Sequence, residues 1–185
     1  MKKLSEMSLS ELWRLFPIVL TEHRDCWKNW YAEEADSLKK IIPPSVRTEH
    51  IGSTAVSTIW SKPIIDILME ISEGCDMSAV KDRLINSGYT CMSGDEGRYS
   101  FNKGYTENGF AERVFHMHLR YCGDNDELYF RDYLIEHPDT ACEYEKLKLH
   151  LWKKFEHNRD GYTDAKGEFI RKYTDIAKLE YKDRY

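Results

Sequence analysis

The chain has 185 residues, enough for one domain with a sizeable hydrophobic core. Its 27 basic and 32 acidic residues give a net charge of −5, which favours a small ligand and argues against non-specific binding to nucleic acid. No stretch is apolar enough to cross a bilayer or to act as a signal peptide, and the five scattered cysteines form no Cys-x-x-Cys pair, so we expect no membrane partner and a cytoplasmic location.

The first 44 residues predict N-terminal helices. Ser8 and Glu11 have the spacing of a capping box, so a helix begins there, and Pro17 ends or bends it. A second helix is expected over residues 22–40, because Trp27 and Leu38 recur at helical spacing. The pair of prolines at 43–44 stops it. Tryptophans at this spacing are typical of a hydrophobic core.

Residues 45–122 predict the sheet, and residues 123–185 a helical C-terminal part. Strands are expected at 46–51, 63–71, 89–92, 99–102 and 112–121, a helix at 77–86, and loops at 93–97 and 104–109. After residue 124 the apolar residues recur at helical spacing. The pattern predicts a single α/β (α+β) domain, with a mixed sheet flanked by helices.

One residue in the second expected strand needs an explanation. Asp66 stands in the run Ile64-Ile65-Asp66-Ile67-Leu68-Met69, whose Ile, Leu and Met content is typical of a buried strand. An ionised carboxylate there is costly unless its charge is compensated. Strand alternation places Asp66, Leu68 and Glu70 on one face and Ile65, Ile67 and Met69 on the other. The second face is expected to be core.

Three groups of motifs resemble the GrpB family, whose members have a nucleotidyltransferase-like fold. They are Glu49-His50-Ile51-Gly52-Ser53-Thr54-Ala55-Val56 followed by Lys62-Pro63-Ile64-Ile65-Asp66-Ile67-Leu68, then Phe115-His116-Met117-His118-Leu119, and a helical tail with Phe130-Arg131-Asp132-Tyr133-Leu134 and Tyr144-Glu145-Lys146-Leu147-Lys148. The resemblance covers the chain from about Arg47 to the C-terminal helices. It implies that the Gly52-Ser53 turn presents backbone N–H groups to a phosphate while Asp66 holds a divalent cation as the catalytic carboxylate.

The resemblance also shows a departure from an active nucleotidyltransferase. The motif there is acid-x-acid, which places two carboxylates side by side on one metal site. Here the second position is Leu68, and Glu70 lies roughly 13 Å further along the strand from Asp66, beyond the reach of a shared cation. This departure argues against two-metal nucleotidyl transfer and leaves a nucleotidyltransferase with one metal as the alternative.

The last strand supplies histidines in place of a third acid. His116 and His118 share a strand face, so their rings are expected to converge beside Asp66. The three side chains form either a site for a divalent metal such as Mg²⁺, Mn²⁺ or Zn²⁺, or a polar cluster in which the imidazoles hydrogen-bond Asp66 without a metal. Both alternatives place these residues in one pocket with Gly52 and Ser53.

The expected ligand is a nucleotide or another small phosphorylated molecule. The residues predicted to bind it are His50, Gly52, Ser53, Thr54, Lys62, Arg98 and Arg131, with Arg113 as a further cation. The alternative is a catalytically inert accessory or interaction module, because GrpB-like segments occur in relatives fused to dephospho-coenzyme A kinase. The missing second carboxylate favours this alternative, whereas the Gly-Ser turn and Asp66 favour a ligand site.

Overall fold

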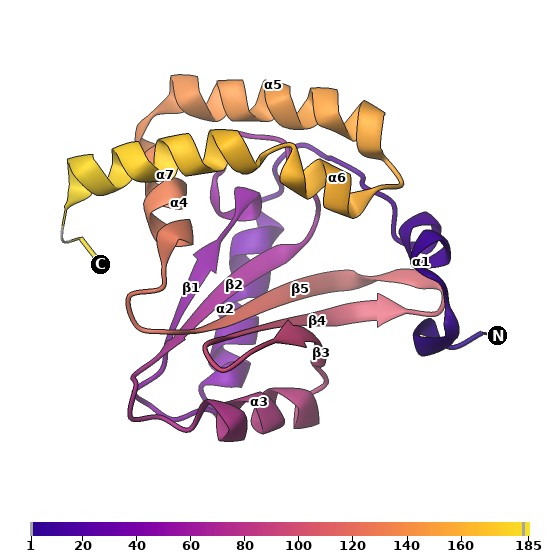
Figure 1. The fold of residues 1–185 in the computed structure, drawn as a ribbon, viewed down its shortest axis with the longest axis vertical. Coiled ribbons are helices and arrows are strands. Elements are labelled where there is room, and N and C mark those ends of the chain that lie inside the picture. Colours follow the sequence, from indigo (N-terminus) through magenta and orange to yellow (C-terminus); the bar gives the residue numbers. More distant parts are fainter. Residues whose placement is uncertain (1, 183) are drawn as a thin grey trace.

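Five strands form one mixed sheet in residues 2–182 and 184–185, which the computed structural model describes (Figure 1). Their order is β1-β2-β5-β4-β3, in which β2 and β5 are parallel and the other neighbours are antiparallel. The strands are β1 (Arg47–Ile51), β2 (Ile65–Ile71), β3 (Thr90–Gly94), β4 (Arg98–Thr106) and β5 (Gly109–Tyr121). The mixed sheet predicted from the sequence is confirmed.

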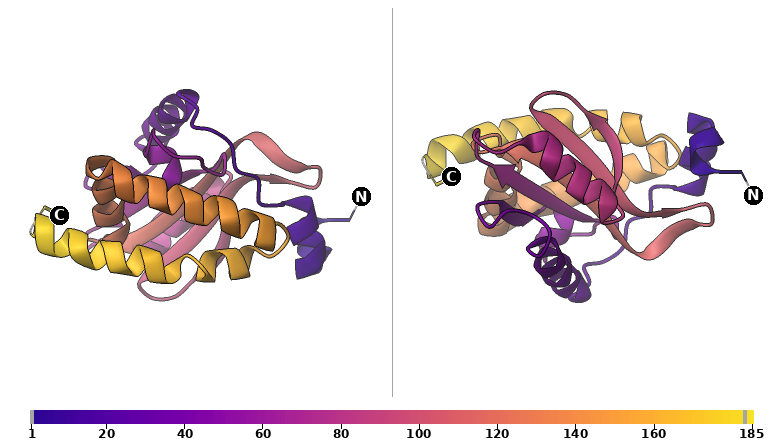
Figure 2. Two further views of the ribbon diagram at one scale, coloured as in Figure 1. Left: turned by 90° about the horizontal axis from the view of Figure 1, so that it is seen from above. Right: turned by 90° about the horizontal axis from the view of Figure 1, so that it is seen from below.

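The helices cover both faces of this sheet. They are α1 (Leu9–Leu15), α2 (Cys26–Leu38), α3 (Met77–Asn86), α4 (Asp126–Glu136), α5 (Pro138–Phe155), α6 (Arg159–Asp164) and α7 (Gly167–Tyr181), with the 3-10 turns η1 (Leu4–Glu6) and η2 (Ser53–Ala55). Helices α5, α6 and α7 lie on one side of the sheet and α3 on the other (Figures 1 and 2). Helix α1 begins at the predicted capping box, where the Ser8 backbone N–H donates to the Glu11 carboxylate at 2.7 Å.

The apolar face of the sheet forms the main core. Ile65, Ile67 and Met69 of β2 are fully buried. They pack with β5 residues and with α2 and α3, through residues that include Phe115, Met117, Leu119, Trp27, Leu38 and Leu84. Burying this much apolar surface is the dominant favourable contribution to folding. Strand alternation then leaves the intervening residues on the opposite face.

The opposite face carries the polar residues singled out in the sequence. In the parallel register of β2 and β5, Asp66 lies opposite His116 and Leu68 opposite His118. Leu68 is fully buried with Ile51 and Leu128 of α4, so the apolar residue at the second motif position anchors α4 to the sheet. This face, covered by α4–α7, contains the candidate site.

One predicted loop is wrong. Residues 104–109 are mostly strand: β4 extends to Thr106 and β5 begins at Gly109, leaving only a tight turn between them. The pairing register shifts between Lys103 and Tyr105, at Gly104, whose φ is 90°. An added Cβ at Gly104 would lie 2.3 Å from the Arg113 carbonyl oxygen, so only glycine allows this close approach of the two strands.

Within the part of the chain that the structure describes, no helix combines the length and apolar character needed to cross a membrane. The five cysteines are all free thiols. Cys26, Cys75 and Cys91 are half-buried, whereas Cys122 and Cys142 are exposed. The sequence pattern without paired cysteines agrees with this finding.

Candidate functional site

A pocket of about 570 Å³ lies between the polar face of the sheet and helices α4–α7. The sheet side is formed by Gly52, Ser53, Lys62, Asp66 and His118. The helix side contributes apolar, cationic and acidic side chains, among them Phe130, Arg131, Leu134, Tyr144, Lys166, Ile170 and Arg171, with Asp126, Glu127 and Asp175 as the acids. This volume is in the range of small-molecule sites, and the combination of apolar walls with a few polar groups is typical of them.

The turn after β1 needs glycine. Gly52 has a φ of 70°, a conformation that other residues rarely adopt. An added Cβ there would lie 2.4 Å from Asp66 Oδ2, so the backbone of the turn lies directly against the Asp66 carboxylate. Ser53 follows as the first residue of η2. Gly52 therefore allows a close approach of the turn to the carboxylate that a side chain at this position would prevent.

Asp66 and His116 form a hydrogen-bonded chain with Tyr105. His116 Nδ1 lies 3.2 Å from Asp66 Oδ1, and His116 Nε2 lies 2.8 Å from the Tyr105 hydroxyl. Burial lowers the pKa of His116, so the ring is neutral near pH 7. A neutral ring satisfies both contacts when Nδ1–H donates to Asp66 and Nε2 accepts from the Tyr105 hydroxyl.

The shifted register of β4 explains how Tyr105 reaches this chain. Regular alternation would place Tyr105 on the same face as Lys103, which lies opposite Phe115 of the core. The shift at Gly104 instead pairs Tyr105 with Phe110 and turns its hydroxyl toward His116 on the polar face. Tyr105 was not predicted as a site residue, because residues 104–109 were expected to be a loop.

Asp66 remains ionised in this setting. Burial alone would raise the pKa of its carboxyl, but His116 and His118 outweigh that effect and hold the pKa well below its usual range. The side chain is 28% exposed, so it is accessible from the pocket. His118 Nε2 lies 3.8 Å from Asp66 Oδ1, longer than a hydrogen bond. An ionised, accessible carboxylate is thus available to a ligand.

The three side chains fit the polar-cluster alternative better than the predicted metal site. Both ring nitrogens of His116 are engaged, one by Asp66 and one by Tyr105, so neither is free for a metal. In residues 2–182 and 184–185, no group of three His, Cys, Asp or Glu side chains is arranged to hold a metal ion. The set of Asp66, His116 and His118 is therefore not a preformed three-ligand site.

Three lysines bring positive charge to the pocket and its surroundings. Lys62 and Lys166 line the pocket, and their ammonium groups lie 5.6 and 4.3 Å from the centre of the same Tyr162 ring. Lys148 is buried nearby, where it donates to the Trp60 carbonyl and lies over Tyr144. Within the described residues, the lysines that form ion pairs are Lys2, Lys39, Lys81, Lys103 and Lys178, so none of these three is included.

The positive charge of these three lysines is destabilised by their surroundings. Burial, together with the neighbouring cations Lys166 and Arg159, lowers the pKa of Lys62 to about 7. Burial also lowers the pKa of Lys148 to about 7 and that of Lys166 to about 8. An anion bound beside these lysines would favour their charged forms and restore their usual pKa values.

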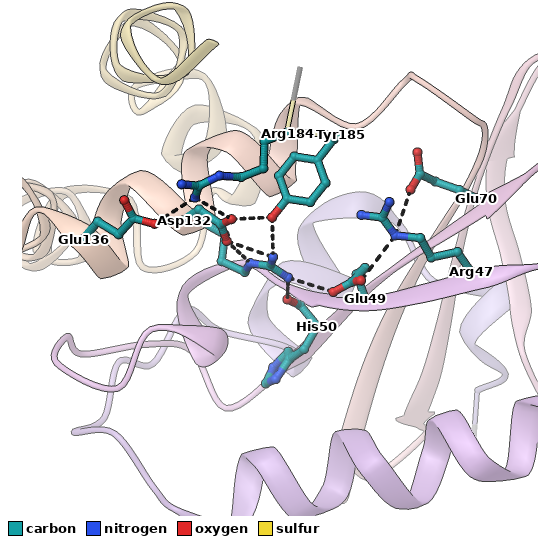
Figure 3. A network of polar contacts seen from close by, with 9 residues as sticks. Arg47, Glu49, His50, Glu70, Asp132, Glu136, Arg184 and Tyr185 are labelled. Atoms are coloured by element: carbon teal, nitrogen blue, oxygen red, sulfur yellow. Dashed lines mark hydrogen bonds and ion pairs between the residues drawn. The ribbon is translucent and has the colours of Figure 1, made fainter. Parts of the chain in front are cut away.

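Arg131 is fixed at the edge of the pocket by a polar network (Figure 3). Its guanidinium donates to Asp132 at 2.8 Å, to Glu49 at 3.1 Å and to the His50 carbonyl at 2.9 Å. Tyr185 accepts a further hydrogen bond at 3.0 Å and itself donates to Asp132. Arg131 and Asp132 therefore contact each other, although adjacent residues of a helix do not usually face each other.

Four of the predicted residues, counting the further cation Arg113, lie outside the pocket's lining. His50 Nε2 and Thr54 Oγ1 are 2.9 Å apart, and Thr54 is buried and donates to the Ile64 carbonyl, so this pair supports the turn from behind. Arg98 is exposed and forms a bidentate pair with Asp124, both contacts at 2.6 Å. Arg113 pairs with Glu33 at the surface. Gly52, Ser53, Lys62 and Arg131 do line the pocket.

The chain is similar to known proteins over most of its length. The family model described as "GrpB protein" matches residues 17–175. The chain belongs to the GrpB family. It is 34% identical to the Glutamate-rich protein GrpB of Alkalihalophilus pseudofirmus, over 83% of this chain and 91% of that protein. It is also 30% identical to UPF0157 protein YqkA of Bacillus subtilis, over 98% of this chain but only 54% of that protein.

Solved structures agree with the family and the fold. The crystal structure of the conserved protein GrpB from Enterococcus faecalis has a TM-score of 0.76 at 30% identity, covering 88% of this chain and 99% of that one. The Cid1 poly(U) polymerase with MgGTP bound has a TM-score of 0.51 at 12% identity, covering 80% of this chain and 47% of that one. The nucleotidyltransferase-like fold expected from the resemblance is confirmed. At 12% identity the second likeness concerns the fold alone.

Proposed function

We propose that this GrpB-family chain binds a small phosphorylated molecule, a nucleotide, in the pocket between the Gly52-Ser53 turn and helices α4–α7. The observation that carries the proposal is the group of lysines at and beside this pocket, the half-buried Lys62 and Lys166 and the buried Lys148, none of which forms an ion pair within the described residues. A phosphate placed between Lys62 and Lys166 compensates their charge and gains charge-assisted hydrogen bonds.

The apolar walls support a ligand with a ring. Phe130 and Tyr144 contact each other edge to face, with ring centres 5.2 Å apart, and Ile170 and Leu134 line the same pocket. A nucleobase or a similar flat group packs well against such side chains. The Cid1 poly(U) polymerase that shares the fold has a crystal structure with MgGTP bound, which favours a nucleotide as the first ligand to test.

Catalysis is proposed to be weak or absent. The second motif position is Leu68, which is fully buried under α4, so Asp66 is the single motif carboxylate at the pocket. Without a second carboxylate, the charge that develops on the attacking and leaving oxygens is not stabilised by a metal clamp. Asp66, held ionised by His116, is then a group that orients a ligand hydroxyl or amine.

Calorimetric titration with ATP, GTP, CTP and UTP, each with and without Mg²⁺, tests the binding proposal. The matching nucleosides, which lack phosphate, are the ligand controls. Lys62→Met and Lys166→Met are expected to weaken nucleotide binding by about 10- to 100-fold each, because each removes a hydrogen bond to a charged group. Lys40→Met, at an exposed position of the segment after α2, is the matched control and leaves binding unchanged.

Several results would contradict the binding proposal or the proposal of weak catalysis. Nucleosides that bind as tightly as nucleotides, or lysine variants that bind normally, exclude a phosphate subsite at Lys62 and Lys166. Absence of binding by any nucleotide or by inorganic phosphate leaves the inert accessory module as the better hypothesis. Release of pyrophosphate that disappears in Asp66→Asn would show that catalysis occurs and that other groups complete the site.

A further inference from the structure

A second, smaller pocket lies behind Lys62. Its volume is about 130 Å³. The segment that follows α1 forms one wall with Pro17 and Ile18, and β5 forms another with Phe110 and Val114. Helix α1, helix α6 and the turn between β4 and β5 lie at the same end of the sheet in all views (Figures 1 and 2). Three segments far apart in the sequence thus enclose this pocket.

The walls of the second pocket are mainly apolar, but cations line it too. Lys62 and Arg159 are half-buried in its lining, whereas Arg24 and the acidic Glu112 are exposed. The arginines that form ion pairs in the described residues are Arg47, Arg98, Arg113, Arg120, Arg131 and Arg184, so neither Arg24 nor Arg159 is among them. The Arg159 guanidinium lies 5.5 Å from the centre of the Tyr105 ring.

Lys62 belongs to the lining of both pockets. The two pockets therefore meet at the Lys62 side chain, and Asp66, which holds His116, lines the larger of them. A group bound in the small pocket and a phosphate bound in the large one would both contact Lys62. Such an arrangement is typical of sites that hold two ligands side by side.

We propose that the small pocket binds a small apolar carboxylate, with its apolar part against Ile18, Phe110 and Val114 and its charged end at Lys62 and Arg159. The size agrees, because a cavity of about 150 Å³ in another protein holds benzene. The planar guanidinium of Arg159 matches a carboxylate in two parallel hydrogen bonds. A neutral apolar molecule would leave these cations uncompensated, and a bare phosphate would leave the apolar walls without a contact.

Ligand-observed NMR with benzoate and benzamide tests the proposal on the complete chain. Benzoate is expected to bind with a Kd of about 1 mM, a usual affinity for so small a ligand, and benzamide about tenfold more weakly. Arg159→Met should weaken benzoate binding about tenfold. Ala111→Phe fills the exposed side of the pocket and should abolish benzoate binding, while Ala32→Phe, at an exposed position of α2 outside both pockets, should not.

The same variants separate this inference from the nucleotide proposal. Ala111→Phe should retain nucleotide binding, because Ala111 lines the small pocket alone. Equal binding of benzoate and benzamide, undiminished benzoate binding in Arg159→Met, or no benzoate binding at all overturns the carboxylate site. Benzoate binding that persists while no nucleotide binds overturns only the nucleotide proposal. If Ala111→Phe does not unfold cooperatively, Arg159→Met and the benzamide comparison decide the question.

Discussion

The two faces of β2 and β5 are built from alternate residues of the same strands, yet they differ in what they contact. Ile65, Ile67 and Met69 are fully buried against α2 and α3. One residue along the strand, Asp66 remains accessible to a pocket and is held by His116. One face therefore stabilises the chain by excluding water, whereas the other keeps ionised groups where a ligand can reach them.

The polar face is itself divided along β2. Glu70, two positions beyond Leu68, is buried, accepts from Asn125 Nδ2 at 2.9 Å and from the Gly123 N–H at 3.2 Å, and lies 3.4 Å from Arg47. Within residues 2–182 and 184–185, no backbone N–H donates to the Asp66 side chain, which opens to the pocket. Two carboxylates on one strand face thus differ in role: Glu70 fixes the connection from β5 to α4, and Asp66 faces the ligand pocket.

The largest effect is expected from removing core volume on the apolar face. Ile67→Ala should lower the free energy of unfolding by about 2–5 kcal/mol, because it removes buried methyl groups and leaves a cavity. Asp66→Asn, the adjacent residue on the other face, should change it by no more than about 1 kcal/mol, because the amide oxygen still accepts from His116. Denaturant unfolding monitored by circular dichroism measures both. Equal losses would show that the two faces do not differ as described.

The next effect concerns the turn at the polar face. Gly52→Ala should lower stability by about 1–3 kcal/mol, since its φ is 70° and the new Cβ would press on Asp66 Oδ2. Gly74→Ala is the matched control, because nothing lies within 4 Å of a Cβ there. Thermal unfolding of the two variants checks the prediction. A Gly52→Ala protein as stable as Gly74→Ala would mean that the turn can relax away from the carboxylate.

The pH dependence of the free energy of unfolding tests the lowered pKa values of the lysines. The pKa of Lys62 falls from 10.5 to about 7 on folding, so between these pH values the unfolded chain binds a proton that the folded chain does not. Stability should therefore rise with pH across this window, by up to about 1.4 kcal/mol per pH unit from this lysine. The same sign holds for Lys166 above pH 8. Urea unfolding at several pH values should give a shallower rise in Lys62→Met and the wild-type rise in Lys40→Met.

The smallest effect is expected at the surface. Arg98→Ala should lower stability by about 0.2–1 kcal/mol and leave ligand binding unchanged, because the Arg98 side chain is 62% exposed and its pair with Asp124 is screened by solvent. High salt should reduce even this difference. Calorimetric titration of the variant with nucleotide provides the second measurement. Weakened nucleotide binding in Arg98→Ala would restore Arg98 to the predicted ligand set.

Part of this arrangement was predictable from residue patterns alone. The capping box at Ser8, the period of two around Asp66 and the helical period after residue 124 depend on neighbours within a few positions. The faces of Asp66, His116 and His118 follow from the same local geometry. Lys148 was also detectable, because it stands among the apolar residues of the α5 stripe, between Tyr144 and Leu151.

Other features needed the tertiary structure. Tyr105 reaches His116 because the register shifts at Gly104, and no short pattern separates that shift from a loop. Lys166 and Arg159 line the pockets because α6 and α7 pack over the sheet. Both residues stand about 100 positions after Asp66 in the sequence. Periodicity is a local property, so the two faces of the sheet and the candidate carboxylate could be predicted from the sequence alone. Long-range packing alone decided which cations surround that carboxylate, which histidine nitrogens remain free and where the two pockets meet.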